Sequence, residues 1–218
     1  ACYFKSGDVV NLGIGIPSLC GNYAEPGVLF QSENGFIGVG PIAEGMEISE
    51  QMYNAGGVPF LPQSGGCACD VSMSFGVIRS GRMAATVLGA LQVAENGDLA
   101  NWATPSRYFG MGGAMDLCSN AKKVIVAMEL CSKDGKPKIV KECTYPLTAI
   151  RCVSHIVTEY GVIDVTEQGL MLAGSFDVLA GKVIRIGHMG ANANDADMED
   201  VMAALDHTLR ALGVPLKK

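Results

Sequence analysis

The sequence predicts an α/β fold built on an open, mostly parallel sheet with flanking helices. Hydrophobic residues make up 49% of the 218-residue chain and charged residues only 17%, which is typical of a well-buried core. Apolar runs at residues 9–12, 28–30 and 122–128 indicate buried strands, and the last has the continuous apolar character of a parallel strand. A chain of this length is enough for one substantial domain.

The first predicted strand, at residues 9–12, runs into a glycine-rich turn. Gly13 and Gly15 precede Pro17, which predicts a tight turn into a helix with Pro17 near its first position. A single Gly-x-Gly is a weak phosphate signal, and the third glycine of the dinucleotide pattern is missing. We therefore favour close packing of this turn on the strand over a nucleotide site.

The second strand, at residues 28–30, leads into Ser32-Glu33-Asn34-Gly35, where a carboxylate is followed by a turn dipeptide. Ligands of open α/β sheets bind at the carboxyl ends of strands, and a glutamate is ionised at pH 7 without help from a base. Glu33 is therefore a candidate nucleophile. On the residues alone we favour a competing interpretation, a β-hairpin, because Asn-Gly between apolar runs is a strong hairpin signal. Glu33 would then be a solvated residue at the sheet's edge.

The next segments mix helix and loop signals. Residues 45–57 predict a short irregular helix. Residues 58–62 contain two prolines, which argue against a central strand because proline cannot donate to the sheet's hydrogen bonds. Residues 70–78 predict a helix that is capped by Asp70 and ends near Gly81.

The apolar run at residues 84–93 predicts a buried strand with Gln92 as its polar exception. Gln92 falls near the strand's end, where a site would lie, and we weigh this equally against a buried glutamine bonded to the backbone. Trp102 follows in a loop, where it either covers a ligand or closes the edge of the core.

A second glycine cluster, with Gly112 and Gly113, precedes the apolar start of a helix at Ala114. Backbone N–H groups at such a place are free to point at an anion or an oxyanion. Taken alone, the pattern favours a glycine-rich turn without a ligand. Gly112, Gly113 and Ala114 are the candidate donors.

The rest of the chain adds a charged loop, a hairpin and a helix. Residues 133–137 predict a solvated turn, and residues 156–158 and 161–166 predict the two strands of a hairpin. Residues 195–212 carry apolar side chains at helical spacing, which indicates core packing or a subunit contact rather than a cofactor site.

Composition argues against several classes of function. The net charge is −6 without any Lys/Arg run, so we expect no nucleic-acid partner and no anionic membrane surface as a partner. No apolar run approaches the roughly 20 residues that span a bilayer. The chain opens without the basic segment and apolar core of a secretory signal, and we expect a cytoplasmic location.

The eight cysteines are scattered through apolar segments, which indicates buried free thiols rather than a disulfide framework. Cys67 and Cys69 form the single close pair, two further ligands at metal spacing are missing, and the three histidines are dispersed. We therefore expect no metal site.

The motif Ser32-Glu33-Asn34-Gly35, with Gly38 close behind it, resembles the active-site signature of the family I CoA-transferases, β-subunit type. The 3-oxoacid, acetoacetate and butyrate CoA-transferases belong to this group. The resemblance runs from about Gly7 to Leu172, with further similar blocks at residues 11–17, 88–93, 97–102, 110–117 and 146–148. It implies a CoA-transferase (NagB/RpiA-like) fold for a domain at residues 1–172.

The resemblance also implies an activity. Glu33 would carry the acyl group and then CoA in a ping-pong transfer between a short-chain acyl-CoA (3-oxoacyl, acetyl or butyryl) and a carboxylate. Asn34, residues 112–114 and Gln92 would contact the oxyanion or CoA. CoA is then a co-substrate, with no permanently bound cofactor, and an α subunit completes the site in a heterotetramer.

Three positions depart from the family pattern. Ser106 and Arg107 stand where the family has glycine and lysine, and Leu130 stands where a histidine is usual after the glutamate. These changes touch contacts with CoA rather than the nucleophile, and Arg107 still offers a cation for an anionic group. No motif marks the residues that select the acyl group.

The tail, residues 173–218, predicts a C-terminal strand–helix segment of uncertain origin. The motif at residues 183–190 resembles the small domain of class V pyridoxal-phosphate aminotransferases, in which the residue matching Arg185 grips a substrate carboxylate. No segment before it resembles their cofactor domain or Schiff-base lysine. Two alternatives to a catalytic β subunit follow: a noncatalytic assembly subunit, and a chimeric chain with an aminotransferase-derived tail.

Overall fold

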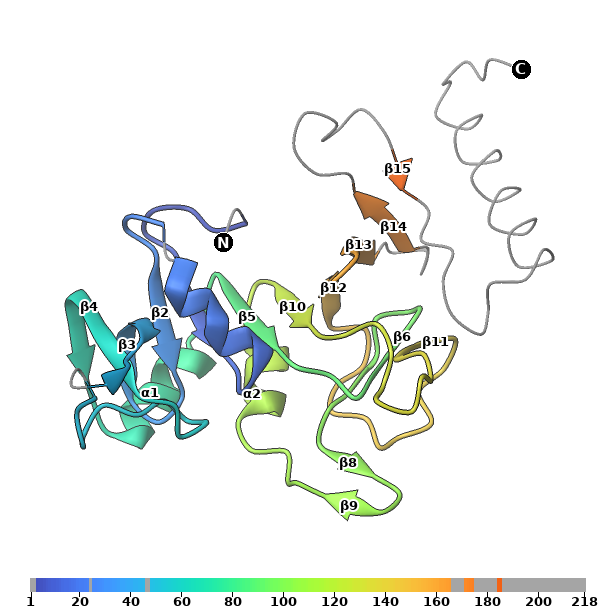
Figure 1. Ribbon diagram of the computed structural model, residues 1–218, viewed down its shortest axis with the longest axis horizontal. Helices are drawn as coiled ribbons and strands as arrows, with labels where there is room; N and C mark the ends of the chain where they lie inside the picture. Colours follow the sequence, from blue (N-terminus) through green and yellow to red (C-terminus); the bar gives the residue numbers. More distant parts are fainter. Residues whose placement is uncertain (1–2, 24, 46–47, 166–170, 175–183, 186–218) are drawn as a thin grey trace.

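The computed structural model describes residues 3–23, 25–45, 48–165, 171–174 and 184–185, with side chains as far as Val165. Among these residues the main feature is a ten-stranded sheet in the order β15-β14-β13-β12-β10-β5-β1-β2-β3-β4 (Figure 1). Its five central strands are parallel neighbours, namely β12 (Val153–Thr158), β10 (Val124–Ala127), β5 (Ala85–Leu88), β1 (Val9–Leu12) and β2 (Leu29–Ser32). The predicted α/β fold is confirmed.

Both flanks of the sheet are antiparallel. One flank is formed by β3 (Phe36–Ile42) and β4 (Phe60–Ala68), and the other by β13 (Gly161–Val165), β14 (Met171–Gly174) and β15 (Ile184–Arg185). The strand pairs β2–β3 and β12–β13 follow each other after short turns, which can join only antiparallel strands. The mostly parallel pattern therefore holds for the centre of the sheet.

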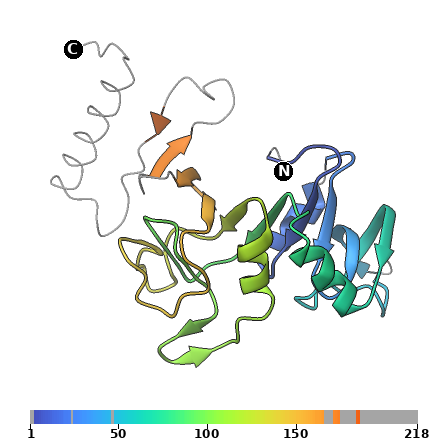
Figure 2. The ribbon, with the colours of Figure 1, turned by 180° about the vertical axis from the view of Figure 1, so that it is seen from behind.

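Helices cover both faces of the parallel centre. The 3-10 helix η1 (Ile16–Tyr23) lies in front of it in Figure 1, whereas α1 (Val71–Arg79) and α2 (Ala114–Asn120) lie on the other face, seen in Figure 2. The predicted cap of α1 is confirmed, because the Asp70 side chain accepts a hydrogen bond of 3.0 Å from Met73 N.

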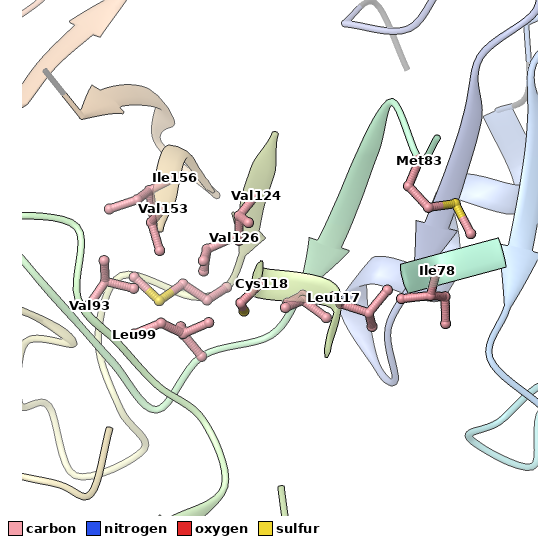
Figure 3. Close-up of a cluster of buried hydrophobic side chains, with 13 residues drawn as sticks. Ile78, Met83, Val93, Leu99, Leu117, Cys118, Val124, Val126, Val153 and Ile156 are labelled. Carbon is pink, nitrogen blue, oxygen red and sulfur yellow. The ribbon is translucent and has the colours of Figure 1, made fainter. Parts of the chain in front are cut away.

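The alternation of side chains along the strands produces two hydrophobic clusters. Val124 and Val126 of β10 belong to one cluster with Ile78 of α1 and Leu117 of α2, and in Figure 3 Leu117 lies between the two valines and Ile78. The alternate residues of β10 belong to the second cluster, on the side of η1, whose buried members include Val10, Phe30, Ile125 and Ala127. Because α1 and α2 are both fixed on the first cluster, the segment that begins α2 is held beside α1.

The helix expected at residues 45–57 is wrong for the part that the structure describes, because residues 48–57 form turns and an isolated bridge. Local polar bonds explain the difference: Asn54 Oδ1 accepts hydrogen bonds from Gly56 N and Val58 N, and such bonds compete with helix formation.

The strand expected at residues 84–93 is divided. The chain leaves the large sheet after β5, and β6 (Gln92–Ala94) joins β7 (Leu99–Ala100) and β11 (Ile139–Val140) in a separate three-stranded sheet. The break at Gly89 is stabilised by Asn101, whose Nδ2 donates to Gly89 O at 3.2 Å. A two-stranded ribbon, β8 (Ala103–Thr104) with β9 (Arg107–Tyr108), follows.

Several smaller predictions have clear outcomes. Pro62 lies in β4 at the sheet's edge, so the exclusion of a central strand is confirmed. The hairpin of β12 and β13 is confirmed. The seven described cysteines are free, but only Cys118 is buried, so the expectation of buried thiols is wrong for the other six.

Some predictions lie outside the described residues. They are the helix at 195–212 and the motif at 183–190, of which only the backbone of residues 184–185 is described. In the described part of the chain, every helix is too short or too polar to cross a membrane.

Candidate active site

Glu33 lies in a three-residue loop that joins β2 to β3. The loop closes with a hydrogen bond of 3.1 Å from Gly35 N to Ser32 O, and Gly35 has a φ of +119°. A Cβ on Gly35 would overlap Cys69 O, while Cys69 N donates to Gly35 O at 2.8 Å. Glycine is required here both for the backbone angle and for this close approach to the segment before α1. The hairpin interpretation is therefore confirmed as backbone geometry.

The side chain of Glu33 is not the solvated edge residue that a simple hairpin implies. It is half-buried, and its carboxylate lies close to the backbone of Gly113, whose N–H lowers the pKa of the carboxyl. A Cβ on Gly113 would overlap Glu33 Oε2 and would lie 2.9 Å from Cζ of Phe75. A Cβ on Gly112 would lie 3.9 Å from Oε1. The carboxylate thus lies against the bare backbone of the glycine pair, beside an aromatic ring.

Burial is the main electrostatic influence on Glu33. It raises the pKa of the carboxyl above its ordinary value, the nearby Gly113 backbone N–H lowers this pKa, and the negative charge of Asp116 raises it further. Asp116 is itself held ionised by Arg79, with contacts of 2.8 and 3.1 Å that lower the Asp116 pKa. A partly desolvated carboxylate with a raised pKa is a stronger base and nucleophile than a solvated one.

The other predicted site residues differ in their relation to Glu33. Ala114 N donates to Met111 O at 3.2 Å, so this donor is engaged in the turn that begins α2. Asn34 Nδ2 donates to Tyr53 O at 2.8 Å, and Ala55 N donates to Ser32 Oγ at 2.9 Å. Asn34 therefore fastens the segment at residues 53–55 to the hairpin loop.

Gln92 belongs to the separate three-stranded sheet. Its Oε1 accepts from Thr144 N at 2.8 Å and from Tyr145 N at 3.1 Å, and its Nε2 donates to Thr144 Oγ1. Gln92 is thus bonded to the backbone, as one of the two interpretations of the sequence expected, although it is half-buried rather than buried. None of these hydrogen bonds connects Gln92 with Glu33. Trp102 likewise has a structural bond, from Nε1 to Leu147 O at 3.1 Å.

A row of buried polar side chains next to the site was not predicted from the sequence. Thr86, Asn11, Gln31 and Ser74 are each at most 1% exposed and are joined by hydrogen bonds across β5, β1, β2 and α1. For Asn11, Gln31 and Thr86, the sequence did contain a signal, because each is a polar residue within a predicted or observed apolar strand. Ser74 lies in α1, where no such signal exists. Among the described residues, no three His, Cys, Asp or Glu side chains gather as a metal site would require.

Comparisons with known proteins identify the family of the chain. The family profile described as Coenzyme A transferase matches residues 1–174. The acetate CoA-transferase subunit β of Escherichia coli K12 is 48% identical over 161 residues, which cover 72% of this chain and 73% of that protein. A probable coenzyme A transferase subunit β of Bacillus subtilis is 46% identical over 175 residues, covering 79% and 81% of the two chains.

A solved structure shows the same fold. The acyl-CoA transferase of Escherichia coli O157:H7 superimposes with a TM-score of 0.58 at 19% identity, covering 80% of this chain and 36% of that one. The chain therefore belongs to the coenzyme A transferase family of enzymes, and within that family it is similar to the β subunits.

Proposed function

We propose that the chain is a catalytic β subunit that moves CoA between a short-chain acyl-CoA and a carboxylate, with Glu33 as the nucleophile. The short-chain acyl groups are 3-oxoacyl, acetyl or butyryl. The observation that carries the proposal is the half-buried Glu33 carboxylate against Gly113 N–H, at the end of a central strand.

The chemistry follows from a carboxylate nucleophile. Glu33 attacks the thioester carbonyl and CoA thiolate leaves, which gives an acyl-glutamyl anhydride. The thiolate then attacks the glutamyl carbonyl, forming a Glu33–CoA thioester and releasing the first acid. A second carboxylate reverses both steps and leaves as the new acyl-CoA, so the kinetics are ping-pong and CoA is a co-substrate.

Each step passes through a tetrahedral oxyanion that needs a donor near Glu33. Gly113 N–H is our candidate for this donor, because its backbone lies against the Glu33 carboxylate. The loss of one such donor costs roughly 3–4 kcal/mol in known oxyanion holes. The same N–H, which lies close to the resting carboxylate, is available to the oxyanion once Glu33 is acylated. The adjoining Phe75 ring limits the access of water to the anhydride.

The decisive experiment is intact-mass spectrometry of the chain, mixed with its α partner, after acetoacetyl-CoA and again after borohydride. We expect a CoA-sized adduct that maps to Glu33 by peptide mass and disappears in Glu33→Gln. Glu95→Gln, a change at an exposed turn, is the matched control and should keep the adduct. If a correctly assembled complex gave no adduct on Glu33, the chain would be a noncatalytic assembly subunit instead.

An α-subunit partner, in a heterotetramer, belongs to the same proposal. Apolar side chains near the Glu33 loop are exposed, by 36–60%, on α1 and around the start of α2; they are Val71, Met73, Phe109, Met111 and Met115. Uncovered apolar side chains gathered on one part of a surface are typical of a subunit interface. The names of the related β subunits also imply a second subunit type in those enzymes.

Light scattering after co-expression with a candidate α subunit tests this partner. We expect a complex with two copies of each chain, and Met73→Asp on the exposed face should weaken it. A chain that remained a monomer with every candidate α subunit would count against the partner.

The tail carries a second candidate. The family match ends at residue 174, and the motif around Arg185 resembles an aminotransferase domain, so a chimeric chain would have an aminotransferase-derived end. We propose the CoA-transferase domain at residues 1–172 as the active unit and expect no pyridoxal-phosphate absorption band. A visible band in purified protein that borohydride removes would favour the chimera.

A further inference from the structure

We propose that Gln31 and Ser74 form a positioning bridge that holds the Glu33 carboxylate against Gly113 N–H. The bridge is a hydrogen bond of 2.8 Å from Gln31 Nε2 to Ser74 Oγ, and it joins β2 to α1. Its catalytic consequence rests on the proposed function, whereas its effect on the contact between Glu33 and Gly113 does not.

The bridge is one end of a directional row of hydrogen bonds. Thr86 Oγ1 donates to Asn11 Oδ1 at 3.0 Å, and Asn11 Nδ2 donates to Gln31 Oε1 at 2.6 Å. Gln31 is 0% exposed, so both ends of its amide must find partners inside the protein. The two partners, Asn11 and Ser74, fix the glutamine in one orientation.

The position of Gln31 connects the bridge to Glu33. Gln31 lies in β2, and Glu33 is the first loop residue after this strand, two positions further on. Gln31 reaches Ser74 of α1, and the Glu33 carboxylate lies against Gly113 next to Phe75 of the same helix. The bridge therefore fixes the end of β2 relative to α1 close to the nucleophile.

In the contact between Glu33 and Gly113, the position of Gly113 is related to α1 through Phe75. This residue follows Ser74 on α1, and its Cζ lies next to the position that a Cβ on Gly113 would occupy. The α1 helix is also bound to α2 by the ion pair of Arg79 and Asp116. Ser74 thus anchors the helix that adjoins Gly113, while Gln31 anchors the strand that carries Glu33.

An apolar residue would fill the same space more simply. A buried amide gains little net stability from its hydrogen bonds, whereas it fixes a unique arrangement of the elements that it joins. A displacement of a fraction of an ångström between the strand and the helix is costly where a carboxylate must meet one N–H group.

The test is the pH titration of the Gly113 amide proton by NMR in the full chain. The sequence has only three Gly-Gly peptides, at residues 56–57, 65–66 and 112–113, so combined ¹³C-carbonyl and ¹⁵N glycine labelling reduces the spectrum to three signals. In the wild type, the Gly113 signal should move as Glu33 titrates, and Glu33→Gln should abolish this change. Asp116 titrates at lower pH because of Arg79.

Ser74→Ala removes the bridge, and Thr86→Val is the matched control, since it removes one equally buried hydrogen bond at the far end of the row. We expect Ser74→Ala to reduce the titration shift of Gly113 at least twofold and Thr86→Val to leave it unchanged. Ser74→Cys keeps the side-chain volume and replaces the hydroxyl by a thiol, which is a weak hydrogen-bond acceptor. We expect a Gly113 titration shift between those of the wild type and Ser74→Ala. This variant replaces Ser74→Ala in the test if the alanine variant does not fold.

In the assembled enzyme, Ser74→Ala should lower kcat about tenfold with KM within about twofold, whereas Thr86→Val should change kcat less than twofold. The bridge is overturned if Ser74→Ala keeps the full Gly113 shift, or if Thr86→Val reduces the shift equally. The absence of a Glu33–CoA adduct in the wild type would contradict the proposed function. The Gly113 titration does not depend on that function, so it tests the bridge separately.

Discussion

Two turns of this molecule have nearly the same local structure and different surroundings. In Ser32-Glu33-Asn34-Gly35 the glycine N–H donates to Ser32 O at 3.1 Å, and in Ser132-Lys133-Asp134-Gly135 it donates to Ser132 O at 2.9 Å. Both glycines have positive φ, +119° and +78°. The first turn is packed against Cys69, whereas a Cβ on Gly135 would meet nothing within 4 Å.

The carboxylates of the two turns consequently differ in chemistry. Burial raises the pKa of Glu33, whereas the Ser132 hydroxyl and Lys136 lower the pKa of Asp134, which is open to solvent. The sequence predicted a solvated turn at residues 133–137, and this is confirmed. The turn motif therefore determines only where the carboxylate stands in the chain. The elements packed around the turn determine whether that carboxylate is partly buried, as in Glu33, or a solvated surface charge, as in Asp134.

The largest difference should appear in activity. Glu33→Gln removes the nucleophile, and we expect kcat to fall by at least about 10³-fold in the assembled enzyme. Asp134→Asn makes the same chemical change in the solvated turn and should stay within about twofold of the wild type. Steady-state CoA transfer measures both, and equal losses in the two variants would remove the distinction between the turns.

The glycine that faces Glu33 should be the next most sensitive position. A Cβ in Gly113→Ala would overlap the Glu33 carboxylate and crowd Phe75, so we expect kcat to fall about 10²-fold. Gly76→Ala is the control, because Gly76 lies on α1 with open space around it. That change should leave kcat intact and stabilise the fold by up to about 1 kcal/mol in urea unfolding.

The glycines of the two turns offer a test of packing. Gly135→Ala should cost about 1–2 kcal/mol of unfolding free energy, because a Cβ is strained at positive φ. Gly35→Ala should cost more, since its Cβ would also overlap Cys69 O. Urea titrations compare the two directly, and a Gly35 variant as stable as the Gly135 variant would contradict the close packing of the first turn.

The smallest expected effect is a difference in stability with pH. Because the folded pKa of Glu33 is raised, its ionisation opposes folding, so Glu33→Gln should melt at a higher temperature than the wild type at pH 7. This gain should vanish below the ordinary pKa of 4.5, where the carboxyl is protonated in both the folded and unfolded states.

Asp134→Asn should show the opposite sign. The folded pKa of Asp134 is lowered, so its ionised form contributes stability above the unfolded pKa, and this contribution is lost as the pH falls through the folded pKa. The variant should therefore melt slightly below the wild type at pH 7. Melting curves from pH 3 to pH 8 measure both variants, and shifts of the same sign would contradict the assigned environments.

The sequence by itself determined the local structure of the site. Apolar runs gave the central strands, Asp70 gave the start of α1, Asn34-Gly35 gave the hairpin, and the Ser32-Glu33-Asn34-Gly35 motif gave the family resemblance. Each of these signals depends on residues that are neighbours in the chain, where backbone preferences and side-chain periodicity act directly.

Only the tertiary structure decided which polar groups meet. It placed Gly113 and Phe75 at Glu33, assigned Gln92 to the backbone of Thr144 and Tyr145, and buried Gln31 against Ser74. These partners come from separate elements of the sheet and its covering helices. Because desolvation and hydrogen bonding depend on distance in space rather than along the chain, the reactivity of Glu33 is fixed only when β2, α1 and α2 pack together.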